Sequence, residues 1–205
     1  MEMVISRKYE VLGQLGQGGM GVVHKVRHVA LDTVLALKVL PHDLMANPEM
    51  VTRFYREARV MARLRHPNII RVLDIEHDEA LGFHYFVMEY IQGKTLRQYL
   101  QEQGPLSLPD LLTISTQVAR ALVYAHAHKP PVVHRDIKPA NIMIEDGSSR
   151  VVVMDFGIAK ELGDGEMTQS GVVLGTLRYC SPEQLRHEPL DGSADVYALG
   201  MVMYE

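Results

Sequence analysis

Three glycines in this 205-residue chain have a spacing that suits a phosphate-binding segment. Gly16, Gly18 and Gly21 form a G-x-G-x-x-G pattern, and glycine lets backbone N–H groups approach a phosphate where any Cβ would obstruct them. With 16 glycines in the chain, the pattern arises by chance in about one such sequence in ten, so a plain flexible hairpin is the competing interpretation. A strand rather than a helix is expected after it, which counts against a dinucleotide-binding fingerprint.

A lysine lies in an apolar stretch soon after these glycines. Strand alternation places Lys38 on the same face as Val34 and Ala36, and such a lysine often extends its charged end to water at an edge. If Lys38 is buried it needs a carboxylate, which Glu57 could supply from the middle of a helix expected to cross the sheet. The alternative for Glu57 is a surface pair with Arg53, four residues earlier.

The most specific pattern is H-R-D-I-K-P-A-N at 134–141, followed by D-F-G at 155–157. An H-R-D-x-x-x-x-N pattern is expected by chance about once in two thousand sequences of this composition. With L-A-L-K at 35–38 and S-P-E at 181–183, the chain resembles the protein kinases. The residues within its motifs are most similar to those of the eukaryotic-like serine/threonine kinases of bacteria. The resemblance runs over residues 9–205.

The resemblance implies a phosphotransferase that uses ATP with Mg²⁺ or Mn²⁺, and it assigns catalytic and metal-binding roles. Asp136 would accept or orient the proton of the substrate hydroxyl, and Lys138 would steady the transferring phosphate. Asn141 and Asp155 would hold the metal ion. These residue types fit phosphoryl transfer, which asks a protein mainly to position two oxygens and to neutralise charge.

The resemblance also implies an ATP site in which Lys38, paired with Glu57, would hold the α- and β-phosphates. The implied ATP-binding residues are Leu15, Gly16, Gly18, Gly21, Val23, Ala36, Lys38, Met88, Glu89, Ile91 and Met143. Backbone groups of Glu89 and Ile91 would bond to the adenine ring. The apolar members have a competing interpretation, since Val23, Ala36 and Met143 would be plausible core residues in any fold.

The implied substrates are proteins with serine or threonine acceptors, because Lys138 and Thr176 follow the pattern of serine/threonine kinases. Arg135 could pair with a phosphate on the loop after Asp155. We expect phosphorylation of Thr168 or Ser170, in trans within a transient homodimer, to order this loop through Arg135. The competing interpretation is that both are ordinary exposed hydroxyls.

Two other functional classes stay open. The first is an inactive, truncated ATP-binding or regulatory module that retains every motif. The second is a small-molecule kinase of related fold, which the long 155–183 segment disfavours because it suits a peptide-docking platform.

The helices and strands that we expect to position these residues indicate an α+β, bilobal protein-kinase-like fold. The N-lobe, 9–91, is expected to be a five-stranded antiparallel sheet with one helix, and the C-lobe, 92–205, to be mainly helical and incomplete. Period-2 alternation predicts strands at 9–15, 22–28, 33–40, 69–75 and 83–88. Apolar residues at three- and four-residue steps predict a helix from 47 to about 66.

Two capping pairs predict helix starts in the second lobe: Thr95 with Gln98, and Ser107 with Asp110. A last helix is expected to begin near Ser193. Because the sequence stops inside that helix, we expect a fragment whose final helix leaves an uncovered apolar face. That face comprises Val196, Leu199, Val202 and Met203. The resemblance gives Asp195, on the same helix, the role of bracing the catalytic loop.

Composition excludes several other classes. A net charge of −4 and a pI of about 6.2 disfavour binding to nucleic acid or to an anionic membrane. No apolar run approaches the length of a membrane span, and Cys180 has no partner for an internal disulfide, so a cytoplasmic protein is expected. The ten histidines are scattered over unrelated elements, which disfavours a histidine metal site.

Overall fold

The computed structural model describes residues 4–18, 21–156 and 177–205, and it divides into two compact units. The first unit contains residues 1–63 and 71–90, and the second contains 64–70 and 91–205. Segment 64–70 therefore belongs to the second unit. Its residue Ile69 forms a parallel bridge with Val153 instead of extending a strand of the first unit, where a strand was predicted to begin.

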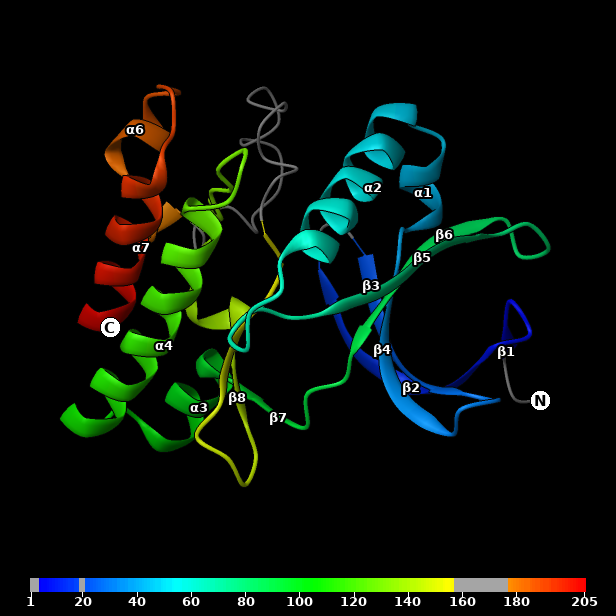
Figure 1. Cartoon of the computed structure of the whole chain (residues 1–205), viewed down its shortest axis with the longest axis horizontal. Helices are drawn as coiled ribbons and strands as arrows, with labels where there is room; N and C mark the ends of the chain where they lie inside the picture. The colour runs from blue at the N-terminus through cyan, green and yellow to red at the C-terminus, as the bar shows by residue number, and fades with distance from the viewer. Residues whose placement is uncertain (1–3, 19–20, 157–176) are drawn as a thin grey trace. The chain divides into compact units, whose positions relative to one another are not determined.

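The first unit is built on a six-stranded antiparallel sheet in the order β1-β2-β3-β4-β6-β5 (Figure 1). Its strands are β1 (Val4–Ile5), β2 (Tyr9–Gly18), β3 (Gly21–His28), β4 (Thr33–Val39), β5 (Val72–Asp78) and β6 (Phe83–Glu89). All five predicted strands are present, although β5 begins three residues later than predicted. The added strand β1 has two residues, too few for alternation to reveal it.

Two helices follow β4: α1 (His42–Met45), which was not predicted, and α2 (Pro48–Arg63). Proline suits the first turn of α2 because its missing N–H would have no partner there. The predicted apolar stripe is buried at Phe54, Ala58 and Met61, and the Phe54 ring lies 5.1 Å from the ring of Phe86 on β6. The helix thus covers the sheet face that also carries Lys38, which pairs with Phe86 in the register of β4 and β6.

The other face of this sheet has its own apolar cluster. Its buried members are Ile5, Tyr9, Val26, Leu35, Leu37, Tyr85 and Val87. Because side chains alternate along β4, Leu35 and Leu37 enter this cluster while Ala36 and Lys38 lie on the opposite face, where Lys38 reaches Glu57 of α2. Both faces of the central strand are therefore covered.

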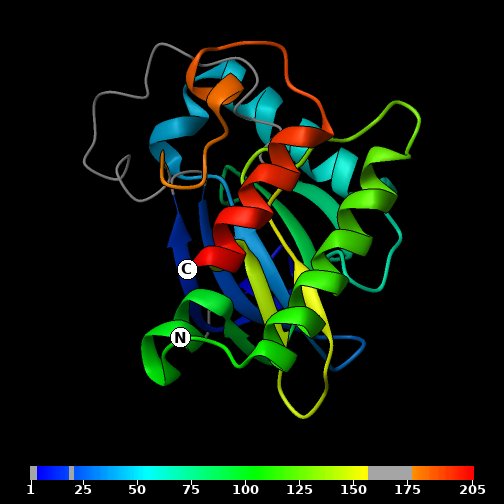
Figure 2. The ribbon, with the colours of Figure 1, turned by 90° about the vertical axis from the view of Figure 1, so that its left-hand side faces the viewer.

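The second unit combines a three-stranded sheet with most of the helices, so the α+β class is confirmed. The sheet has the order β7-β8-β9, with β7 (Gly93–Thr95), β8 (Ile142–Glu145) and β9 (Val151–Val153). The helices are α3 (Leu96–Gln103), α4 (Leu108–His126), the 3-10 turn η1 (Pro139–Asn141), α6 (Pro182–Leu185) and α7 (Gly192–Tyr204). Figure 2 shows α4 and α7 side by side. Thr95 and Ser107 cap α3 and α4 as predicted.

The apolar face of α7 is only partly exposed. Leu199 and Val202 are buried, so the expectation of a fully uncovered face is wrong for these two residues, because α7 packs against α4. Val196 and Met203 do remain exposed, at 62% and 39%.

Candidate active site

The glycine segment of the first unit forms the facing ends of β2 and β3. Gly16 pairs with Val23, and Gly18 pairs with Gly21. A Cβ on Gly21 would lie 2.5 Å from the carbonyl oxygen of Val39, so the fold itself requires glycine there. A Cβ on Gly16 would meet no atom within 4 Å, so the described fold gives no steric reason for glycine at that position.

Lys38 and Glu57 form a buried ion pair within the first unit. Lys38 Nζ lies 3.2 Å from Glu57 Oε1, and their side chains are only 8% and 4% exposed. The ammonium group also lies 5.6 Å from the centre of the Phe86 ring. Arg53, the alternative partner considered for Glu57, pairs with Glu49 instead. Lys38 is therefore a buried cation held by a carboxylate rather than an edge residue.

The other implied ATP-binding positions of the first unit lie on β2, β3, β4 and β6. Ala36 and Met88 are buried partners in adjacent strands. Glu89 donates its backbone N–H to the carbonyl oxygen of Arg71 at 3.0 Å, and its side chain accepts the Arg71 N–H at 2.9 Å. Any backbone hydrogen bond from Glu89 to a ligand would therefore use its carbonyl oxygen. Leu15 is exposed.

The second unit brings Asp136, Lys138 and Asn141 together. Lys138 Nζ lies 2.9 Å from Asp136 Oδ2. Asn141 Nδ2 donates to the same carboxylate oxygen at 3.0 Å and to the Asp136 carbonyl oxygen at 2.8 Å. The η1 turn makes this contact, because its proline fixes the backbone just before Asn141. The Asp136 carboxylate is thus held in one orientation by a cation and an amide.

The donor set at Asn141 and Asp155 fits a Mg²⁺ ion. Both Asn141 side-chain contacts use its nitrogen, which leaves Oδ1 as the end that can face a cation. The carbonyl oxygen of Asn141 accepts the N–H of Met154, so the residue just before Asp155 is tied to Asn141. Among the described residues there is no group of three His, Cys, Asp or Glu suited to a metal. An ion held by one amide and one carboxylate needs further oxygens, as Mg²⁺ does when it binds with a nucleotide phosphate.

The His134 side chain is fully buried, and its hydrogen bonds fit a single neutral tautomer of the imidazole. Its Nε2 faces the carbonyl oxygen of Met154 at 2.9 Å, while its Nδ1 accepts the N–H of Asp136 at 3.2 Å. This arrangement requires a proton on Nε2 and none on Nδ1. Burial lowers the pKa of the imidazole, against the opposing effect of nearby carboxylates that include Asp195. The ring also packs on Phe156, with 4.4 Å between ring centres.

Asp195 braces the backbone around His134, as the resemblance implied. Its buried carboxylate accepts the N–H groups of His134 and Arg135, both at 2.7 Å. Arg135, the second of these donors, has φ +66°, a left-handed conformation that is uncommon for residues other than glycine. His126 of α4 approaches the same carboxylate at 2.8 Å. The backbone of the catalytic loop is therefore anchored to two helices.

Two further polar groups of the second unit were missed by the sequence reasoning, and one of them contacts the site. Gln184 Nε2 donates to the Arg135 carbonyl oxygen at 2.9 Å, and this glutamine also completes the capping box of α6. Glu205 accepts from Arg97 and Arg178 at 3.0 and 3.2 Å, and from the hydroxyl of Tyr179. The spacing of Ser181 and Gln184 could have indicated the cap of α6. No local signal points to the Arg135 contact of Gln184 or to the contacts of Glu205, because these partners are 26 to 108 residues away.

The structure describes only some of the remaining predicted site residues. Ile91 is buried in the second unit, and Met143 lies on β8, where it pairs with Thr95 and Val152. Thr168, Ser170 and Thr176 lie outside the described residues.

Comparison with known proteins gives one consistent family. Residues 9–205 match the family profile described as "Protein kinase domain". The chain is 44% identical to the serine/threonine-protein kinase pkn3 of Myxococcus xanthus, over 98% of this chain and 38% of that protein. It is 41% identical to the serine/threonine-protein kinase PrkC of Bacillus subtilis, over 98% of this chain and 30% of that protein. The chain thus spans well under half of the length of these relatives.

A solved structure with a similar fold is the PknI kinase domain of Mycobacterium tuberculosis. It has a TM-score of 0.75 and 34% sequence identity, covering 99% of this chain and 73% of that one. The predicted fold class is therefore confirmed. Within the described residues, no helix is both long and apolar enough to cross a membrane.

Proposed function

Because the chain belongs to the protein kinase domain family, we propose that it transfers the γ-phosphate of ATP to serine and threonine hydroxyls of proteins. The observation that carries this proposal is the arrangement around Asp136. Its carboxylate is oriented by Lys138 and Asn141, and its backbone neighbours are fixed by Asp195. Such a preorganised carboxylate suits a reaction in which the protein mainly positions an attacking hydroxyl.

Asp136 would accept the hydrogen bond of the substrate hydroxyl and take its proton as the phosphoryl group transfers. The Lys138 ammonium, 2.9 Å from Asp136 Oδ2, holds the carboxylate in place, which favours the orienting role over early proton removal. That role is sufficient for phosphoryl transfer, whose transition state is loose and places little demand on the nucleophile. Lys138 would also supply positive charge to the transferring group.

In the first unit, Lys38 would bind the α- and β-phosphates while Glu57 holds its ammonium in place. Backbone N–H groups at Gly16, Gly18 and Gly21 would cover the phosphates. The implied adenine-binding residues of this unit are Leu15, Val23, Ala36, Met88 and Glu89. This assignment makes 9–91 the nucleotide-binding lobe and 92–205 the catalytic lobe.

In the second unit, Asn141 Oδ1 and the Asp155 carboxylate would hold Mg²⁺, or Mn²⁺ in its place. When bound, the ion supplies charge neutralisation for the phosphate oxygens. Such hard oxygen donors suit both metals.

The acceptor class and regulation are part of the same proposal. Lys138 supports aliphatic hydroxyl acceptors, as do the names of the relatives. A second copy of the chain would phosphorylate Thr168 or Ser170, and Arg135 would bind the new phosphate. Thr176 would help to position the acceptor beside the catalytic loop. We place this activity in the cytoplasm, where ATP is available.

Transfer of label from [γ-³²P]ATP to casein, followed by phosphoamino-acid analysis, tests the proposal. We expect labelled phosphoserine and phosphothreonine without phosphotyrosine. Asp136→Asn and Asp155→Asn should abolish the signal, whereas Asp146→Asn, an exposed residue of the same unit, should retain it. A chain that binds ATP but transfers no label would support the inactive-module alternative. Equal transfer by Asp136→Asn would refute the catalytic assignment.

A further inference from the structure

The second unit contains an open groove of about 550 Å³ beside α4. The groove is formed by segment 64–70, by α4 and by the turn between β8 and β9. Its lining includes Asn68, Leu112, Thr116, Gln117, Arg120 and Arg150, and none of its lining residues is acidic. None of these residues belongs to the proposed phosphotransfer site.

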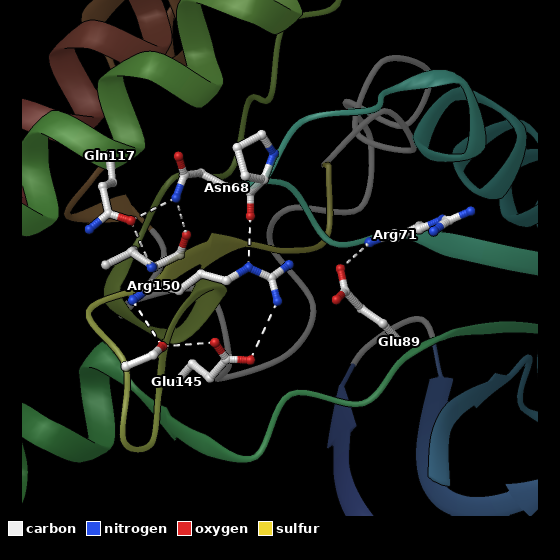
Figure 3. Close-up of polar contacts among 9 residues, drawn as sticks. Asn68, Arg71, Glu89, Gln117, Glu145 and Arg150 are labelled. Carbon is white, nitrogen blue, oxygen red and sulfur yellow. Dashed lines mark hydrogen bonds and ion pairs between the residues drawn. The ribbon is translucent and has the colours of Figure 1, made fainter. Parts of the chain in front are cut away.

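Hydrogen bonds fix the floor of the groove (Figure 3). Asn68 Nδ2 donates to Gln117 Oε1 and to the Val151 carbonyl oxygen, both at 2.7 Å. Gln117 Oε1 also accepts the Val151 N–H at 3.0 Å, and Gln117 Nε2 donates to the Ser149 carbonyl oxygen at 2.6 Å. Three separate chain segments are thereby locked together, so a ligand would meet a preformed surface.

One polar atom of this floor has no hydrogen bond within the described part of the chain. Both side-chain hydrogen bonds of Asn68 use its nitrogen, and within the described part of the chain its Oδ1 accepts none. Asn68 is only 7% exposed, and Figure 3 shows its oxygen turned away from Gln117. This amide oxygen is open to solvent, so it would repel a simple anion but can accept a hydrogen bond from water or from a ligand N–H.

The charged residues of the groove are both arginines. Arg150 is held by the Pro67 carbonyl oxygen at 2.9 Å and by Glu145 at 3.4 Å. Arg120 is exposed, and among the described residues its side chain makes no hydrogen bond or ion pair. Because Glu145 already pairs with Arg150, Arg120 is the cation that the lining residues offer to an acidic ligand.

We propose that this groove binds an extended acidic segment of a partner protein. A backbone N–H of the segment donates to Asn68 Oδ1, and a carboxylate of the segment pairs with Arg120. An apolar side chain of the segment packs on Leu112, which is 52% exposed. The proposal concerns binding and is independent of the proposed phosphotransfer.

Fluorescence anisotropy with a labelled peptide of repeating Glu-Leu-Asp tests this proposal. The matched probe is Gln-Leu-Asn of the same length, and the salt is about 50 mM, where screening is moderate. Arg120→Glu should weaken binding of the acidic peptide about fivefold or more, and Thr116→Lys should strengthen it. Lys129→Glu makes the same change of charge outside the groove, and we expect a change below about twofold.

Thr116 and Arg120 are exposed, so both variants should keep the circular dichroism spectrum and melting temperature of the wild type. A gain of affinity in Thr116→Lys could not come from unfolding. Equal binding of the neutral peptide, or an Arg120→Glu variant that binds as well as the wild type, would overturn the proposal. Displacement of the peptide by millimolar inorganic phosphate at constant ionic strength would also overturn it, because the groove would then be a general anion site.

Discussion

His126 and Asp195 join the two long helices of the second unit, because His126 Nε2 donates to Asp195 Oδ2 at 2.8 Å. The same oxygen accepts the N–H of His134 at 2.7 Å. The imidazole lies against Gly192, where a Cβ would be 2.5 Å from its Nδ1. The absence of a side chain at position 192 thus lets the ring reach the carboxylate that braces the catalytic loop.

Gly192→Ala should therefore destabilise the chain and reduce phosphotransfer together. Overpacking of this kind typically costs about 1–3 kcal/mol, measured as the free energy of unfolding in urea. Adding His126→Ala should remove most of the penalty specific to Gly192→Ala, because it opens the space that the new methyl group needs. The control is Gly200→Ala on the same helix, where a Cβ meets no atom within 4 Å. An equal loss in both glycine variants would contradict this account.

Gly16 and Gly21 should differ sharply in their sensitivity to alanine. Gly21→Ala should lower the melting temperature, since its Cβ would stand 2.5 Å from the Val39 carbonyl oxygen. Gly16→Ala meets no atom within 4 Å and should preserve stability, but it should raise KM for ATP several-fold if phosphates approach there. Gly13→Ala, equally unobstructed and outside the glycine pattern, is the control for KM. An unchanged KM in Gly16→Ala would remove that glycine from the phosphate site.

Lys38→Met should destabilise the first unit by about 3–5 kcal/mol, because it leaves the Glu57 carboxylate buried without its cation. The double variant Lys38→Met/Glu57→Leu should recover much of this loss, since apolar pairs often replace buried ion pairs without cost. Phosphotransfer should stay absent in both. Urea unfolding and label transfer measure the two effects separately. An active double variant would show that Lys38 serves the fold alone.

The buried imidazole of His134 should make stability depend on pH. Burial lowers its pKa below the ordinary value of 6.5, so the unfolded chain binds the proton first as the pH falls. The contribution of the neutral ring is complete above about pH 6.5 and is lost as the pH decreases toward the lower, folded-state pKa. The stability difference between the wild type and His134→Phe should shrink between about pH 7.5 and 5.5. A difference that stays constant over this range would contradict the assignment.

Local patterns were enough to predict most of the architecture. The alternation around Lys38 and the helical period around Glu57 placed both residues in the correct elements. Each element buries one face, and the apolar residues of that face recur at a regular spacing in the sequence. Capping residues marked helix starts for a similar reason. A capping side chain accepts a hydrogen bond from a backbone N–H only two or three residues later, so the signal is local.

The parts that sequence reasoning missed depend on contacts between distant segments. Strand β1 is defined by its pairing with β2. Its two residues are too few to show an alternation of apolar and polar side chains. Segment 64–70 contains strand-forming isoleucines, yet Asn68 ties it to Gln117 of α4 in the second unit. Glu205, at the end of α7, meets Arg97 of α3 across 108 residues of sequence. No local pattern marks such contacts.

The amide of Asn141 has two chemically different ends, and only one of them serves the protein. Its nitrogen donates to the carbonyl and carboxylate oxygens of Asp136. Aspartate at position 141 would keep an oxygen for a cation, but it would replace both donors with a negative charge facing Asp136. The two carboxylates would then repel each other, and Asp136 would lose a donor that fixes its orientation. Asparagine therefore holds its acidic neighbour in place and still presents an oxygen to a cation, two tasks that aspartate could not combine.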